Sequence, residues 1–312
     1  MPHLEVVVDD LGLREAALRV EDLVEVRHLQ LARPDADRVS HVANVPTLGD
    51  AKLCPMPTSL IFDVHVAALE SAAPRLLDLA LQAGLEAPVP TCPAWTVEAL
   101  VAHQAMVHRW AGAHVRGEAP DALPDETTIR ETVADLPGYY REGQVALVDA
   151  LRAAPPDLVA LTFLKDAPAP REFWARRQAH ETTIHMVDAL SASLGRVPTA
   201  EEAHIERAFA VDGIDELLRG FFTRGRSKLF TGTEETVVVA PFDVQERWVL
   251  RVAERLTVEP PGTDEPEGDV TRLVGAAAQL YLGLWNRGDE IEVVGRPDVL
   301  PRWRDRQRVG WS

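Results

Sequence analysis

The residues with the clearest potential for chemistry lie in one polar stretch, residues 176–188, with the sequence RRQAHETTIHMVD. The stretch is close to the H-E-x-x-H pattern of zinc peptidases, but its histidines, His180 and His185, are five residues apart. Five residues turn a helix by about 140°, so these two imidazoles cannot face one metal ion. Glu181 and His185 are four residues apart and share a helix face, so this pair can hold a metal. Asp188 lies on the same face and could orient an imidazole.

A third ligand must come from a neighbouring helix, and His103 is the best candidate because it lies among apolar residues. Two histidines and one carboxylate with open positions are typical of catalytic zinc sites, and other divalent ions bind the same set. On spacing alone, two simpler interpretations stay open. The Glu181/His185 pair could be a solvated helix contact, and His103 an ordinary core histidine. Arg176 and Arg177 are interpreted as a solvated helix face.

These residues need long helices to position them. Apolar periodicity, N-cap residues and helix-ending glycines predict five helices, over 63–83, 96–117, 128–154, 171–194 and 199–219. Pro74 is expected to kink or split the first, and Pro137 with Gly138 the third. Thr199 and Glu202 form a capping-box signature for the fifth. Long amphipathic helices with one long connection indicate a four-helix bundle.

After residue 219 the pattern changes to short apolar runs. These predict strands over 236–242, 247–252, 256–259 and 291–294, and helices over 274–286 and 297–308. The expected fold class is therefore mainly α plus α+β. A helix bundle spans 58–219, and a smaller C-terminal α+β domain spans 220–312.

Residues 1–57 differ from the rest because their charges are irregularly spaced and regular periodicity begins only after Met56. We expect a poorly ordered N-terminal extension. Two explanations stay open: an over-extended gene whose native start lies near Met56, or a real but loose extension.

Composition excludes several classes of protein. Acidic residues outnumber basic ones by 49 to 32, a formal net charge of −17, which argues against nucleic acid and membrane partners. There are two cysteines, Cys54 and Cys92, too few for a disulfide framework, which favours a cytoplasmic location. No basic and apolar leader or run long enough to span a membrane is apparent. Cys92 is interpreted as a packing residue because no base is placed near it.

Several separated motifs resemble the mycothiol-dependent maleylpyruvate isomerase family. They are the Cys92–His103 run, the following Val107–Trp110 segment, and the Ala179–His185 run with Asp188. A helix ending at Arg287 and a terminal Val299–Trp303 segment follow in the family's order. The resemblance covers about residues 60 to 310. It implies a DinB-like metal-binding helix bundle followed by a domain similar to sterol carrier proteins.

The resemblance also implies site residues. The family's divalent-metal ligands fall on His103, Glu181 and His185, the residues that helical geometry selects. A catalytic arginine from the second domain matches Arg287 best. One departure concerns Met186 and Val187, where the family often has Arg-Trp. Without that arginine, a positive charge is missing at the expected mouth of the site, which puts the family's usual substrate in question.

The function implied is a metal-dependent, mycothiol-using enzyme, either an isomerase or a thiol S-transferase acting on a small electrophilic substrate. Its cofactors would be a divalent metal, zinc first, and mycothiol, and its partners a small-molecule substrate and this low-molecular-weight thiol. The alternative is a non-catalytic small-molecule binding protein with a structural or vestigial metal site.

Overall fold

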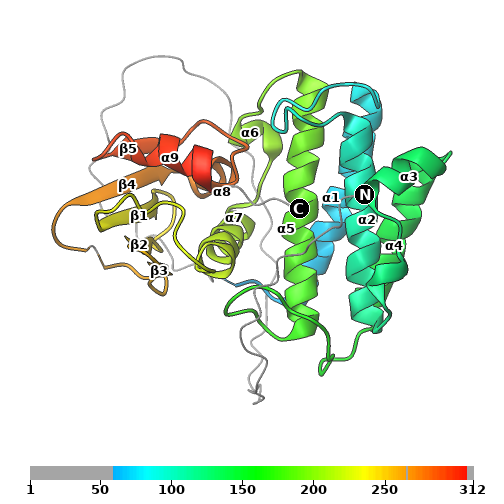
Figure 1. Cartoon of the computed structure of the whole chain (residues 1–312), viewed down its shortest axis with the longest axis horizontal. Coiled ribbons are helices and arrows are strands. Elements are labelled where there is room, and N and C mark those ends of the chain that lie inside the picture. Colours follow the sequence, from blue (N-terminus) through cyan, green and yellow to red (C-terminus); the bar gives the residue numbers. More distant parts are fainter. Residues whose placement is uncertain (1–58, 265, 308–312) are drawn as a thin grey trace, which may run out of the picture. The chain divides into compact units, whose positions relative to one another are not determined.

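The computed structural model describes residues 59–264 and 266–307, so the predicted extension over 1–57 lies outside the described residues. Four long helices dominate the first half (Figure 1): α1 (Phe62–Ala83), α2 (Val97–Arg116), α4 (Leu136–Ala153) and α5 (Pro170–Leu194). α1 packs along α5, α2 packs along α4, and α2 also contacts α5. Their buried leucines and alanines form one core.

The helix ends follow the predicted signals. The Thr96 hydroxyl caps α2 by accepting the Ala99 N–H at 3.3 Å. α2 and α5 both end at a glycine in the left-handed conformation, Gly117 at φ 70° and Gly195 at φ 69°. Residues with a side chain rarely adopt this conformation. α1 continues through Pro74 as a single element. Helices predicted over 63–83, 96–117 and 171–194 are thereby confirmed.

The helix predicted over 128–154 is wrong in its continuity. It is two helices, a short α3 (Glu126–Thr132) and α4. The break precedes the predicted one because Asp135 accepts the Gly138 N–H at 3.0 Å and caps α4. Pro137 then falls in the first helical turn, where its missing N–H costs no hydrogen bond.

The helix predicted over 199–219 is also divided. Its capping box is present, but α6 (Ala200–Ala203) ends after one turn, at His204 with φ 54°. The chain resumes as α7 (Arg207–Asp215) and widens into a π-helical segment, Glu216–Phe221. π-Helical turns are uncommon and often occur at functional positions.

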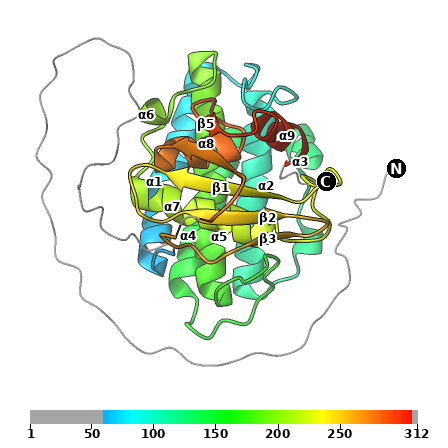
Figure 2. The same cartoon turned by 90° about the vertical axis from the view of Figure 1, so that its left-hand side faces the viewer.

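The second half contains a five-stranded sheet, seen face-on in Figure 2. Its strands follow the order β3-β2-β1-β4-β5. They are β1 (Glu235–Pro241), β2 (Trp248–Val252), β3 (Leu256–Val258), β4 (Val270–Gly275) and β5 (Glu292–Val294). β1 and β4 are parallel, with Val237 opposite Thr271, and the other pairs are antiparallel. α8 (Ala277–Leu284) contacts β1 and β4, and α9 (Val299–Arg306) ends the described chain.

Strand β4 is absent from the sequence-based prediction, which begins a helix at Val274. The strand runs almost directly into the apolar helix α8. The alternating pattern of the strand and the helical pattern that follows therefore form one continuous apolar run in the sequence. Its place inside the sheet, between β1 and β5, depends on pairing with β1, far away along the chain. The fold class, helical followed by α+β, is confirmed.

By their contacts, the described residues all fall within one compact unit. The predicted division at residues 219/220 stays a prediction. None of the helices in the described ranges has the length and apolar character needed to cross a membrane.

One close packing contact ties α7 to α8. A Cβ at Gly213 would lie 2.2 Å from Cε2 of the buried Tyr281 and 2.8 Å from Cε1 of His180. We expect Gly213→Ala to lower the free energy of unfolding by about 1–3 kcal/mol, because neither ring has room to move. Urea unfolding measures this loss.

The matched control is Gly112→Ala in α2, where a Cβ meets only the mobile end of Arg116. Alanine favours the helix by up to about 1 kcal/mol, so this variant should be neutral or stabilised. Equal stabilities for the two variants would contradict the packing argument.

Candidate metal centre

Helix α5 is buried over nearly its whole length, although it carries many polar side chains. Every residue from Phe173 to Ala192 is buried. Arg177 is 0% exposed and Arg176 8%, so the expectation of a solvated face there is wrong. Buried charges are stable only with partners of opposite charge, and both arginines have them. Arg176 pairs with Asp212, and Arg177 with Glu181 and Glu216.

The structure brings the three residues suggested as metal ligands together. His103 comes from α2, and Glu181 and His185 from α5. The Glu181 Oε1 atom lies 3.3 Å from His185 Nε2 and 3.8 Å from His103 Nε2. One ligand atom from each residue lies within 4.8 Å of the others, and all three side chains are buried. We call these residues the first triad.

An indole ring covers this triad. Trp95, immediately before the N-cap of α2, stacks on His185 with ring centroids 5.6 Å apart and lies 4.8 Å from the His103 ring. The backbone before α2 is fixed by a bridge between Pro88 and Thr96. The Trp95 indole therefore packs against both imidazoles of the first triad.

The charges of the triad favour metal binding. Burial alone would raise the pKa of Glu181, but hydrogen bonds from His103 and His185 and the charge of Arg177 hold it well below its usual range. Arg177 donates to Glu181 Oε2 at 3.1 Å, which leaves Oε1 facing the histidines. The glutamate is thus an anion aimed at two imidazoles, a donor set suited to zinc and related divalent ions.

Asp188 orients the second histidine. His185 Nδ1 donates to Asp188 Oδ2 at 2.9 Å, so its Nε2 faces Glu181. Burial lowers the pKa of His185, but its hydrogen bonds to Asp188 and Glu181 outweigh burial and raise it to about 9. Thr91, which sequence analysis missed, also donates to Asp188, at 2.6 Å. A short hydroxyl residue in a loop gives no sequence signal for such a role.

Arg287 reaches the same carboxylate from the C-terminal half. It follows α8 and donates to both oxygens of Asp188, at 3.0 and 3.1 Å. It also donates to Trp285 O at 2.9 Å and lies 2.9 Å from the Cys92 sulfur. Asp188 thereby links a triad histidine to the arginine that sequence analysis selected.

Two further side chains depart from expectation. Met186 and Val187, expected near the mouth of the site, are buried in the core at 3% and 0% exposure. A charged residue would need a buried partner at either position. These substitutions therefore change the interior next to the site and not its entrance.

Comparisons with known proteins agree with this architecture. Residues 66–190 match the family model described as the mycothiol maleylpyruvate isomerase N-terminal domain. Among proteins with curated descriptions, none matches the chain significantly.

Two solved structures share the fold. The crystal structure of the mycothiol-dependent maleylpyruvate isomerase is 17% identical, with a TM-score of 0.52. A histidine-to-alanine mutant of such an isomerase is 15% identical, with a TM-score of 0.53. Each match covers 75% of this chain and 93% of the other. Residues 66–190 thus resemble the N-terminal domain of mycothiol maleylpyruvate isomerases, and the chain shares its fold with the two isomerase structures.

Proposed function

We propose that this protein is a metal-dependent, mycothiol-using enzyme of the maleylpyruvate isomerase type. It would act as an isomerase or a thiol S-transferase on a small electrophilic substrate. The observation that supports this most is the juxtaposition of the first triad with Arg287 across Asp188. The match of residues 66–190 to the isomerase N-terminal domain and the shared fold add to it.

The residues present fit a divalent ion. Zinc binds imidazole nitrogen and carboxylate oxygen at about 2.0–2.2 Å, so ligand atoms around one ion lie roughly 3.3–3.5 Å apart. The Glu181–His185 separation of 3.3 Å meets this, and the His103–Glu181 separation of 3.8 Å needs only a small adjustment. His103, Glu181 and His185 would hold the ion, as proposed from the sequence.

The bound ion would coordinate the thiol of mycothiol and lower its pKa, which supplies a thiolate nucleophile near neutral pH. Trp95 covers the imidazoles on one side and limits access of water. Asp188 accepts the His185 Nδ1 proton, so Nε2 would be the ring nitrogen that holds the ion.

Arg287 is suited to an anionic substrate. Glu181 and Asp188, the carboxylates nearest to Arg287 and the first triad, are each paired with an arginine, Arg177 and Arg287. Nε and Nη2 of Arg287 are paired with Asp188, so Nη1, which also donates to Trp285 O, is the nitrogen with a further N–H for a substrate carboxylate. We propose that Arg287 orients such a carboxylate and stabilises negative charge that develops on it.

The direct test measures turnover by the zinc-loaded protein with mycothiol and either maleylpyruvate or an electrophilic aromatic halide. Thiol-dependent turnover of either supports the proposal, and the reactive substrate separates isomerase from transferase. Stoichiometric zinc without thiol-dependent turnover would instead favour the binding-protein alternative.

The ligand assignment predicts the zinc content of variants. His103→Ala, Glu181→Gln and His185→Ala should each lose one equivalent of zinc per chain, measured by elemental analysis after dialysis. The control is His204→Asn, which changes an exposed histidine at a left-handed position that asparagine tolerates. Unchanged zinc in all three triad variants would refute the assignment.

The role of Arg287 predicts a kinetic defect. Arg287→Lys should lower kcat/KM for a carboxylate substrate by roughly tenfold or more, because a lysine ammonium cannot pair with both oxygens of Asp188 and also donate to the substrate. Zinc content should not change. Arg306→Lys, at an exposed arginine of α9, serves as the control. A normal kcat/KM in Arg287→Lys would exclude the proposed contact.

Cys92 should not act as a nucleophile. Burial, and then the negative charge of Asp188, raise the pKa of its thiol to about 12. At pH 8 its thiolate fraction is then roughly a thousandfold below that of an ordinary cysteine with a pKa near 8.5. Iodoacetamide should modify Cys92 at least tenfold more slowly in the native protein than in urea, as followed by peptide mass spectrometry. Equal rates would overturn this prediction.

A further inference from the structure

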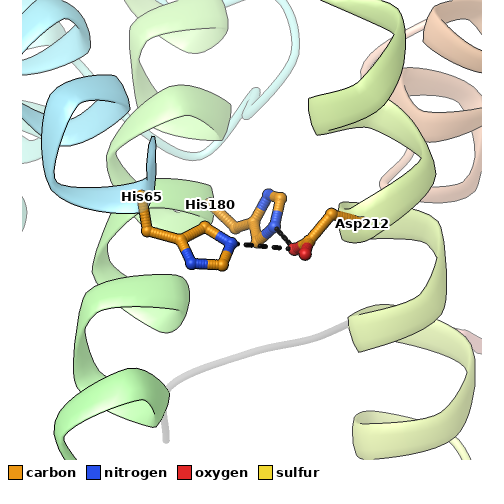
Figure 3. Close-up of side chains that lie close together, drawn as sticks. All are labelled: His65, His180 and Asp212. Carbon is orange, nitrogen blue, oxygen red and sulfur yellow. Dashed lines mark hydrogen bonds and ion pairs between the residues drawn. The ribbon is translucent and has the colours of Figure 1, made fainter. Parts of the chain in front are cut away.

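A second group of metal-ligating side chains lies on the other side of α5. His65 from α1, His180 from α5 and Asp212 from α7 point toward one another (Figure 3). Asp212 Oδ1 lies 3.2 Å from His65 Nε2 and 2.6 Å from His180 Nε2. All three residues are buried, at 2% exposure or less. We call these residues the second triad.

The second triad has the same donor set as the first. Each combines two imidazoles with one carboxylate, and in each an arginine from α5 donates to that carboxylate. Arg177 donates at 3.1 Å to Oε2 of Glu181, the oxygen turned away from the histidines, whereas Arg176 donates at 2.8 Å to Oδ1 of Asp212, the oxygen that faces them. The arginines are consecutive, as are Glu181 and His180, so α5 presents the two triads on different faces.

Each triad also has a histidine whose other ring nitrogen is held. His185 Nδ1 is bonded to Asp188, and His180 Nδ1 lies 3.1 Å from the Tyr281 hydroxyl. Metal-binding histidines are characteristically fixed in this way, because the second contact sets the tautomer and the ring orientation. With Nε2 on a metal, His180 Nδ1–H would donate to the Tyr281 oxygen.

We propose that His65, His180 and Asp212 form a second metal site, for a zinc-class ion with imidazole and carboxylate ligands. The second oxygen of Asp212 accepts the Leu60 N–H at 2.6 Å, so the carboxylate is fixed independently of the histidines. The His65–Asp212 separation already matches two ligands of one ion, and the His180–Asp212 separation needs to widen by under about 1 Å.

The burial of this site gives it a structural role. Its ligands come from three helices, and the adjacent Tyr281 belongs to α8. An ion there would join α1, α5 and α7 beside the contact between α7 and α8. The first triad, which lies next to Arg287 and Cys92, keeps the proposed catalytic role.

Zinc stoichiometry of the full chain tests the proposal. Wild type should bind two equivalents, Glu181→Gln one, His65→Gln one, and the double variant none. His204→Asn is the control and should bind two. The second site would be overturned if wild type bound one equivalent of zinc, Glu181→Gln bound none and His65→Gln still bound one. If wild type bound one equivalent of zinc, His65→Gln bound none and Glu181→Gln still bound one, the second site would be supported and the first refuted.

Thermal unfolding of Glu181→Gln tests the second site even if His65→Gln does not fold. In Glu181→Gln, which lacks the first site, added zinc should raise the unfolding midpoint in proportion to the logarithm of its concentration, because it binds the folded chain. Cobalt should give visible d–d absorption in the same variant. No shift and no absorption would overturn the second site without bearing on the first.

Discussion

The structure depends on keeping the charged residues of α5 buried. An ionised side chain away from water costs several kcal/mol unless an opposite charge and hydrogen bonds compensate it. α5 carries two arginines, a glutamate and an aspartate into the interior. The elements around it must therefore provide matching groups at fixed positions. This requirement explains why α7, the π-helical segment and the chain after α8 all converge on one helix.

The junction between α7 and the π-helical segment meets much of this requirement. Asp215 and Glu216 are adjacent in the chain, but Asp215 pairs with Arg176 while Glu216 pairs with Arg177. Asp215 also accepts the Trp248 indole N–H at 3.1 Å, which connects α5 to strand β2. One short segment thus neutralises two buried arginines and joins the helices to the sheet.

The sequence predicts the first triad because two of its members lie on one helix face, where spacing alone sets their geometry. It does not predict the second triad, whose residues come from three helices and meet only through tertiary packing. The prediction that Arg176 and Arg177 form a solvated face is wrong for a related reason. Consecutive arginines indicate a solvated face unless their distant partners Asp212 and Glu216, more than thirty residues away, are known. Strand β4 is missed because its identity comes from pairing with β1 and not from its own residues.

The contact between Asp188 and Arg287 has a consequence for the order in which the protein matures. These residues are separated by 99 positions, so the buried carboxylate of Asp188 lacks its ion-pair partner until the chain beyond Arg287 has been synthesised and has folded back. Helices α1 to α5 leave the ribosome earlier. At that stage all three residues of the first triad have been synthesised, but Arg287, the partner of Asp188, has not. Formation of this ion pair is thus coupled to completion of the C-terminal half, and a prematurely terminated chain would carry the residues of the first triad without Arg287.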